Sequence, residues 1–104
     1  MTLPVYILAR VPGATDTTEW TDILEIKRRL RQSFVLVAYY PTRDTSRWVT
    51  VENKQPFFVE LCHGRHFGTA TMSRHVTLAA AMRSAKRVAK LFAHPVPGRA
   101  AKCG

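Results

Sequence analysis

Two absences limit what this chain can be. The sequence has only two cysteines, Cys62 and Cys103, so a disulfide framework is excluded and both thiols are expected to be reduced. No apolar run approaches the roughly 20 residues that a membrane-spanning helix needs. The apolar stretch at residues 5–9 is shorter than the core of a signal peptide, which predicts a cytoplasmic protein. A membrane-surface helix needs bulky apolar residues, whereas alanine dominates the apolar positions of residues 76–93, so no membrane partner is expected.

A third absence concerns acidic residues in the second part of the chain. All seven Asp and Glu side chains lie in residues 1–60, together with eight of the 16 Lys and Arg side chains. Residues 61–104 hold the other eight basic residues, all four histidines and no acid. The formal charge of +9 is therefore concentrated in the second part, which favours an anionic partner: nucleic acid or an acidic protein surface.

Hydrophobic periodicity predicts two helices and four or five strands. Asp16 and Glu19 form a capping pair before a helix over residues 17–32, and Ser73 is expected to cap an alanine-rich helix that runs from 75 or 76 to 93. The strands are expected at residues 3–9, 33–40, 47–52, 57–62 and, as a short fifth strand that returns in a hairpin, 66–72.

This order of elements, β-α-β-β-β-(β)-α, predicts an α+β protein. We expect a two-layer sandwich in which two helices pack against a mostly antiparallel sheet of 4–5 strands. Residues 33–40 are apolar on both faces, which is typical of a central strand. Residues 1–95 would form a single domain, and residues 96–104 a flexible basic C-terminal tail.

The last helix carries a row of bases. They recur at steps of three and four residues, so they lie side by side opposite the apolar face, and no acid on the same helix relieves their repulsion. A bound anion would relieve it, although a solvated face would show the same pattern. If four to six phosphates are met, the log–log dependence of affinity on salt should have a slope of roughly −4 to −5. The predicted nucleic-acid- or anion-binding residues are Arg65, Arg74, Arg83, Lys86, Arg87 and Lys90.

Alternation along the strands predicts a group of aromatic side chains on the face of the sheet away from the helices. If Phe57 and Val59 point toward the helices, Phe58 points away, together with Trp48 and one of two adjacent tyrosines. Such aromatics would stack single-stranded nucleic acid, anchor a protein partner or form a homodimer seam, unless another element of the chain covers them. The predicted interface residues are Trp48, Phe58, Tyr39 and Tyr40.

Cysteine and histidine cluster at Cys62, His63, His66 and His75. Cys62 and His63 are adjacent in a strand and point to opposite faces, so they would not share a metal ion. No acid follows that would orient a histidine beside Cys62, and the motif Gly64-x3-Gly68 lacks the Lys-Ser/Thr of a phosphate-binding loop. The sequence therefore predicts no metal, no cofactor and no enzyme.

Residues 57–93, which begin FFVELCHGRHFGTATMSR, resemble the second half of a double-stranded-RNA-binding domain. Those domains run α-β-β-β-α, and a strand-Gly-strand hairpin leads into their final helix. The family places paired lysines at the start of that helix, where this sequence has Arg74 and His75 followed by VTL, and the bases here come two turns later. The resemblance implies an α+β fold, but this departure puts the family's phosphate contacts in doubt.

Charge and pattern together predict a small, non-enzymatic, basic nucleic-acid-binding or regulatory protein that contacts the phosphate backbone through its C-terminal helix. The alternative is a small inhibitor or adaptor of the kind that phages and plasmids encode against host defences. Such a protein would dock on a larger protein partner through the exposed sheet aromatics and the basic helix.

Overall fold

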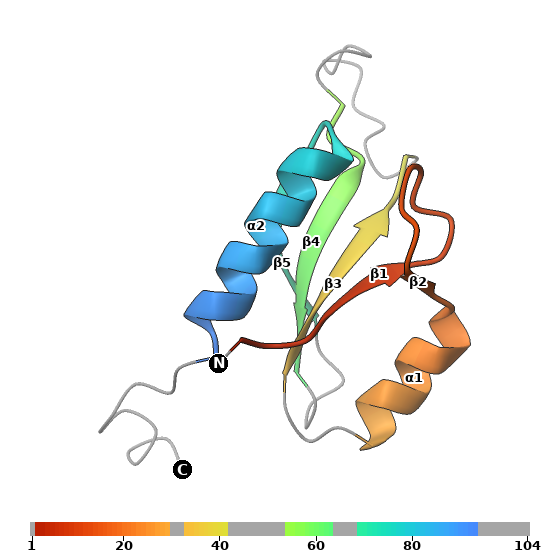
Figure 1. Ribbon diagram of the computed structural model, residues 1–104, viewed down its shortest axis with the longest axis vertical. Coiled ribbons are helices and arrows are strands. Elements are labelled where there is room, and N and C mark those ends of the chain that lie inside the picture. The colour runs from red at the N-terminus through yellow and green to blue at the C-terminus, as the bar shows by residue number, and fades with distance from the viewer. Residues whose placement is uncertain (1, 30–32, 42–53, 64–68, 94–104) are drawn as a thin grey trace.

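The computed structural model describes residues 2–29, 33–41, 54–63 and 69–93 (Figure 1). Its elements follow one another as β1 (Val5–Leu8), β2 (Thr17–Thr18), α1 (Trp20–Arg29), β3 (Phe34–Tyr39), β4 (Phe57–Cys62), β5 (Thr69–His75) and α2 (Leu78–Leu91). The α+β class expected from the sequence is confirmed. The expected strand at 47–52 and the expected tail at 96–104 lie outside the described residues.

The strands form one mixed sheet in the order β2-β1-β3-β4-β5. β1 pairs in parallel with both β2 and β3, whereas β3–β4 and β4–β5 are antiparallel. The sheet is thus less antiparallel than we expected. The reason is the connection from β1 through β2 and α1 to β3, which brings the chain back to run in the same direction as before.

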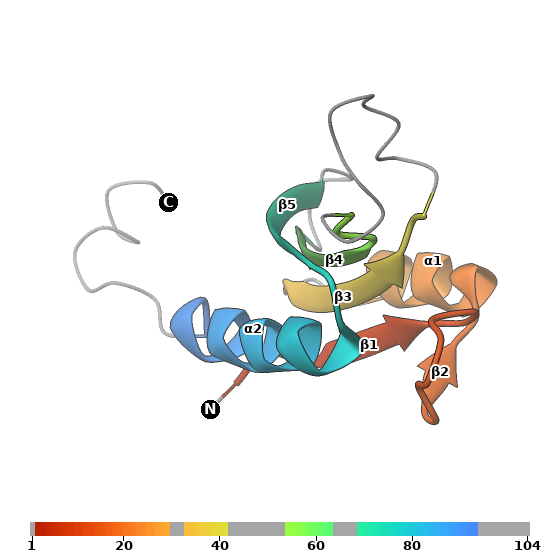
Figure 2. The same cartoon turned by 90° about the horizontal axis from the view of Figure 1, so that it is seen from above.

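The two helices pack against opposite faces of the sheet, so the expected two-layer arrangement is not what the core shows. On β3, Val35 and Val37 face α2 and join its alanines in one core cluster, while Phe34 and Leu36 face α1 and pack around Ile23. Figure 2 shows α1 and α2 on either side of β3. A strand that is apolar on both faces needs cover on both, and each helix supplies one cover.

The first helix begins later than its sequence pattern suggests. Thr17 and Thr18 pair with Ile7 and Leu8 as the short strand β2, and the Ala9 amide donates to the Thr18 carbonyl at 2.9 Å. The helix then starts at Trp20, where the carbonyl of Glu19 accepts from the amides of two residues in the first turn. Glu19 therefore occupies the cap position that we expected for Asp16.

The last strand and the last helix are also displaced from their expected bounds. β5 continues to His75, and Thr77, not Ser73, caps α2 by accepting a hydrogen bond from the Ala80 amide at 3.2 Å. The pairing of β4 with β5 is irregular between Val59 and Glu60, where the register passes from Ser73 to Thr71. This bulge leaves Met72 as an extra residue in β5.

In the part of the chain that the structure describes, no helix has the length and apolar character needed to cross a membrane.

Candidate anion-binding site

The last helix separates an apolar face from a basic one. Its small buried residues, Ala81, Ala85, Val88 and Ala89, lie against the sheet. A row of exposed bases runs along the opposite face, with neighbours three or four residues apart as in any helix stripe. We call this row the basic stripe; its members are Arg83, Lys86, Arg87 and Lys90.

No carboxylate neutralises the basic stripe within the described residues. Neither β5 nor α2 contains an acid, and the first turn of α2 has none. On α1, by contrast, Arg28 forms an ion pair with Glu25, at 3.6 Å between the charged atoms. The positive charge of α2 is therefore open to a partner from outside.

A hollow of about 410 Å³ lies between β5 and α2, beside the basic stripe. Its polar walls are Ser73 and His75 from the strand and Arg83, Ser84 and Arg87 from the helix. The Ser73 and Ser84 hydroxyls share a hydrogen bond of 2.7 Å, and His75 Nε2 lies 2.8 Å from the Ser73 hydroxyl. Two guanidinium groups thus stand next to a chain of hydroxyl and imidazole groups.

The charge state of His75 follows from its surroundings. Partial burial lowers the pKa of this imidazole below its ordinary value of 6.5, and the positive charge of Arg83 lowers it further. His75 is therefore neutral at pH 7, and the positive charge of the hollow comes from its two arginines. Guanidinium groups with nearby hydroxyl donors are suited to bind phosphate oxygens.

Arg74 does not belong to the same surface as the basic stripe. Ser73 points toward α2, so its neighbour Arg74 points to the other face of the sheet, where its guanidinium carbon lies 4.9 Å from the centre of the Phe58 ring. Arg74 Nε also donates to the Gln55 carbonyl at 3.4 Å. The structure thus divides the predicted anion-binding residues between two faces, and Arg65 lies outside the described residues.

Of the four predicted interface residues, the structure describes Tyr39, Tyr40 and Phe58. Alternation places Tyr40 with Phe58, whose ring centroids are 5.1 Å apart, and Tyr39 with Phe57 on the α2 side, at 5.0 Å. Phe58 is only 5% exposed, so it is a buried side chain and not the exposed anchor that one of our hypotheses required. Trp48 lies outside the described residues.

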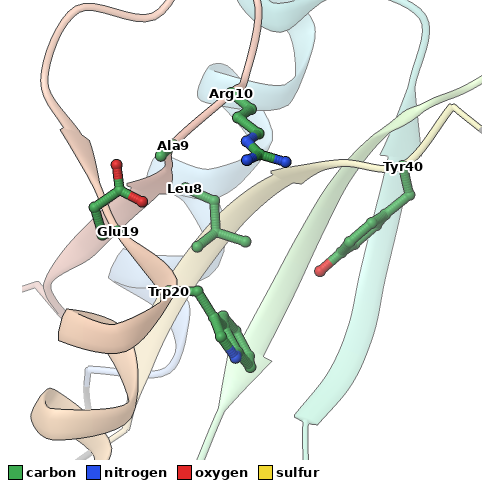
Figure 3. A pocket seen from close by; sticks show the side chains of 6 residues that line it. All are labelled: Leu8, Ala9, Arg10, Glu19, Trp20 and Tyr40. Carbon is green, nitrogen blue, oxygen red and sulfur yellow. The ribbon is translucent and has the colours of Figure 1, made fainter.

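A second hollow, of about 560 Å³, lies where β1 and β3 end (Figure 3). Trp20, Arg10 and Tyr40 surround it, and Glu19 lies at its margin next to Ala9. Our sequence reasoning missed it because Trp20 fits the apolar face of the predicted helix. The signal that was available is the Pro-Gly turn after Arg10, which brings the chain back beside the start of α1.

Of the cysteine and histidine cluster, the structure describes Cys62, His63 and His75, whereas His66 lies outside the described residues. Cys62 is fully buried, and this burial raises the pKa of its thiol to about 11, against a smaller opposing effect of Lys27. A thiol of that pKa is a weak nucleophile at neutral pH. Across residues 2–29, 33–41, 54–63 and 69–93, no group of three or more His, Cys, Asp or Glu side chains could hold a metal ion.

Comparisons with known proteins give this chain no relative: no family model, no curated protein and no solved structure matches it. The resemblance to the double-stranded-RNA-binding domain has no support from these comparisons.

Proposed function

We propose that this protein binds the phosphate backbone of nucleic acid through the basic stripe of α2. The observation that carries the proposal is the stripe itself: four exposed bases on one helix face, with no carboxylate partner among the described residues. A helix that needed charge only for solubility would more often interleave acids with bases.

The geometry of the stripe suits a row of phosphates. From Arg83 to Lys90 the helix rises by about 10 Å, at roughly 1.5 Å per residue. Phosphates on one strand of a duplex advance by about 3.4 Å along the axis, so the stripe matches several successive phosphates. The hollow at Ser73, His75 and Ser84 adds neutral donors beside the two arginines, where one phosphate would be held by hydrogen bonds as well as charge.

The position of Arg74 changes the expected dependence of binding on salt. With that residue on the other face of the sheet, the stripe supplies four cations. The log–log slope of affinity against salt should then be about −3 to −4, and smaller for single strands than for duplexes.

Charge-matched variants test the proposal. The variant K86Q/R87Q removes two positive charges from the basic stripe. The control variant R28Q/R29Q removes two exposed positive charges from α1, so the two variants have the same net charge. In fluorescence-anisotropy titrations of labelled duplex DNA, single-stranded DNA and duplex RNA over a series of salt concentrations, K86Q/R87Q should flatten the slope by about two and weaken binding roughly tens-fold at 0.1 M salt.

The control variant R28Q/R29Q should keep the slope of the parent protein. Equal losses in the two variants would mean that only net charge matters, and binding unchanged in K86Q/R87Q would mean that α2 is not the site. Weak and equal binding of all three nucleic acids would return attention to the alternative, docking on a protein partner. That alternative has lost one anchor, because Phe58 is buried under Tyr40 and Arg74.

A further inference from the structure

The hollow in Figure 3 lies at the point where the sheet connections diverge. In the strand order β2-β1-β3-β4-β5, β1 and β3 are parallel neighbours. From the end of β1 the chain continues to β2 at one edge of the sheet, whereas from the end of β3 it continues to β4 in the opposite direction. Leu8 is the last residue of β1, Ala9 and Arg10 follow it, and Tyr40 follows the end of β3. In open sheets with parallel strands, divergence at the carboxyl ends leaves a crevice, and ligands bind there. The hollow also has a volume usual for a small-ligand site.

Arg10 has a strained backbone conformation. Arg10 has a φ of 74°, and it is the non-glycine residue with positive φ among the described residues. Glycine adopts this conformation without strain, whereas arginine does not. In Figure 3 the Arg10 guanidinium lies over the hollow, opposite Trp20. The strained conformation thus positions a cation beside the open space.

Trp20 provides a flat apolar wall. It is the first residue of α1 and remains 49% exposed, while the core on this face of the sheet is built by Ile23, Phe34 and Leu36. Nucleic acid bases stack on exposed aromatic side chains, and a cation that lines the same space attracts the phosphates and polar edges of such ligands. Tyr40 forms a further wall of the same space.

The hollow is lined by one positive and one negative side chain, Arg10 and Glu19. Arg10 is a donor, Glu19 is an acceptor, and neither is in an ion pair with another described side chain. Guanine has acceptors at O6 and N7 on one edge, which arginine recognises with two hydrogen bonds, and N–H donors on another edge, which a carboxylate accepts. Adenine presents a donor beside N7, and the two carbonyl acceptors of uracil are separated by an N–H donor, so neither matches Arg10 as well.

We propose that this hollow binds an unpaired guanine base, stacked on Trp20 and held at its edges by Arg10 and Glu19. The proposal rests on the proposed function, because it names what part of the nucleic acid the protein reads while α2 holds phosphates. A base can enter only when it is not paired, so the preferred nucleic acid is single-stranded or has an unpaired guanine.

The test uses Trp20 as its own reporter. The sequence has two tryptophans, so the variant W48F leaves Trp20 as the single indole. In this background, titration with guanosine 5′-monophosphate should quench the fluorescence with a saturating curve. Adenosine and uridine 5′-monophosphates carry the same phosphate and should bind at least tenfold more weakly. The variant R10G, whose glycine accepts the positive φ, should lose the guanine preference and remain folded.

Two outcomes would overturn the proposal: equal quenching by all three nucleotides, or guanosine monophosphate binding that R10G leaves unchanged. The result is separable from that of the proposed function. K86Q/R87Q in the W48F background should lose affinity for oligonucleotides yet keep the guanosine monophosphate quench. R10G should keep the salt-dependent binding of a thymine-only strand and lose only the preference for a guanine-containing strand.

Discussion

At the scale of single residues, the chemistry of this protein depends on surroundings that the sequence does not display. His75 lies in the hollow between β5 and α2, where burial and then Arg83 lower its pKa. In the unfolded chain the same imidazole titrates near its ordinary value of 6.5. The difference between the two states links folding to pH.

This linkage has a definite sign. At pH values between the lowered pKa of the folded protein and 6.5, His75 is protonated more in the unfolded state than in the folded state. The free energy of unfolding therefore decreases as the pH falls through 6.5. We expect the advantage of the parent protein over H75Q in urea unfolding to shrink from pH 7.5 to pH 5. An advantage that is constant over this range would contradict the lowered pKa.

The buried thiol of Cys62 offers a second residue-scale prediction. Because it is fully buried and its pKa is raised to about 11, it should react with a thiol reagent only when the protein opens. In the variant C103S, where Cys62 is the single thiol, labelling at pH 8 should be slower by orders of magnitude than in denaturant. Labelling at the same rate in both conditions would show that the α1 side of the sheet is open.

At the scale of elements, local patterns could be predicted and long-range ones could not. The basic stripe follows from spacing along one helix, so its residues could be assigned from the sequence alone. The separation of Arg74 from that stripe depends on the pairing of β5 with β4 and on which face α2 covers. Likewise the apolar character of β3 correctly predicted a central strand, but counting its two apolar faces should also have predicted a helix on each.

The hollow at Trp20 illustrates the same limit. Its walls come from the ends of β1 and β3 and the start of α1, and these lie together only because β1 and β3 are parallel neighbours. If the helix had started at residue 17 as expected, Trp20 would lie inside its first turn, whereas in the structure Trp20 is the first residue of α1. The β-branched pair Thr17–Thr18 instead pairs with β1, and tertiary pairing overrides the local helix signal.

The packing of α2 gives a prediction at this scale. Ala85 is fully buried against the sheet, and Ala79 is an exposed alanine of the same helix. The variant A85L should lose about 1–3 kcal/mol of unfolding free energy by overpacking, measured by urea denaturation. Its control A79L should stay within about 0.5 kcal/mol of the parent protein. Equal stability of the two variants would mean that α2 does not approach the sheet closely at Ala85.

At the scale of the whole molecule, one sheet separates two chemically different regions. α2 and its unopposed charge cover one face, and α1, which holds the ion pair between Glu25 and Arg28, covers the other. The proposed phosphate contacts and the proposed base site are built on different elements. Each can therefore be altered by substitution without removing a residue of the other, and this independence makes the two proposals separately testable.

The bulge in β5 has a consequence for how the molecule tolerates change in chain length. The inward and outward alternation of side chains along β5 reverses at Met72. Thr71 and Ser73 therefore pair with Glu60 and Val59, two adjacent residues of β4 whose side chains point to opposite faces of the sheet. The half with Ser73 and His75 is held by α2, whereas the half from Thr69 to Met72 is exposed. A residue gained or lost in the exposed half would change which way its own side chains face. The serine and histidine of the hollow would keep their orientation, so the bulge isolates this chemistry from length variation in the adjoining hairpin.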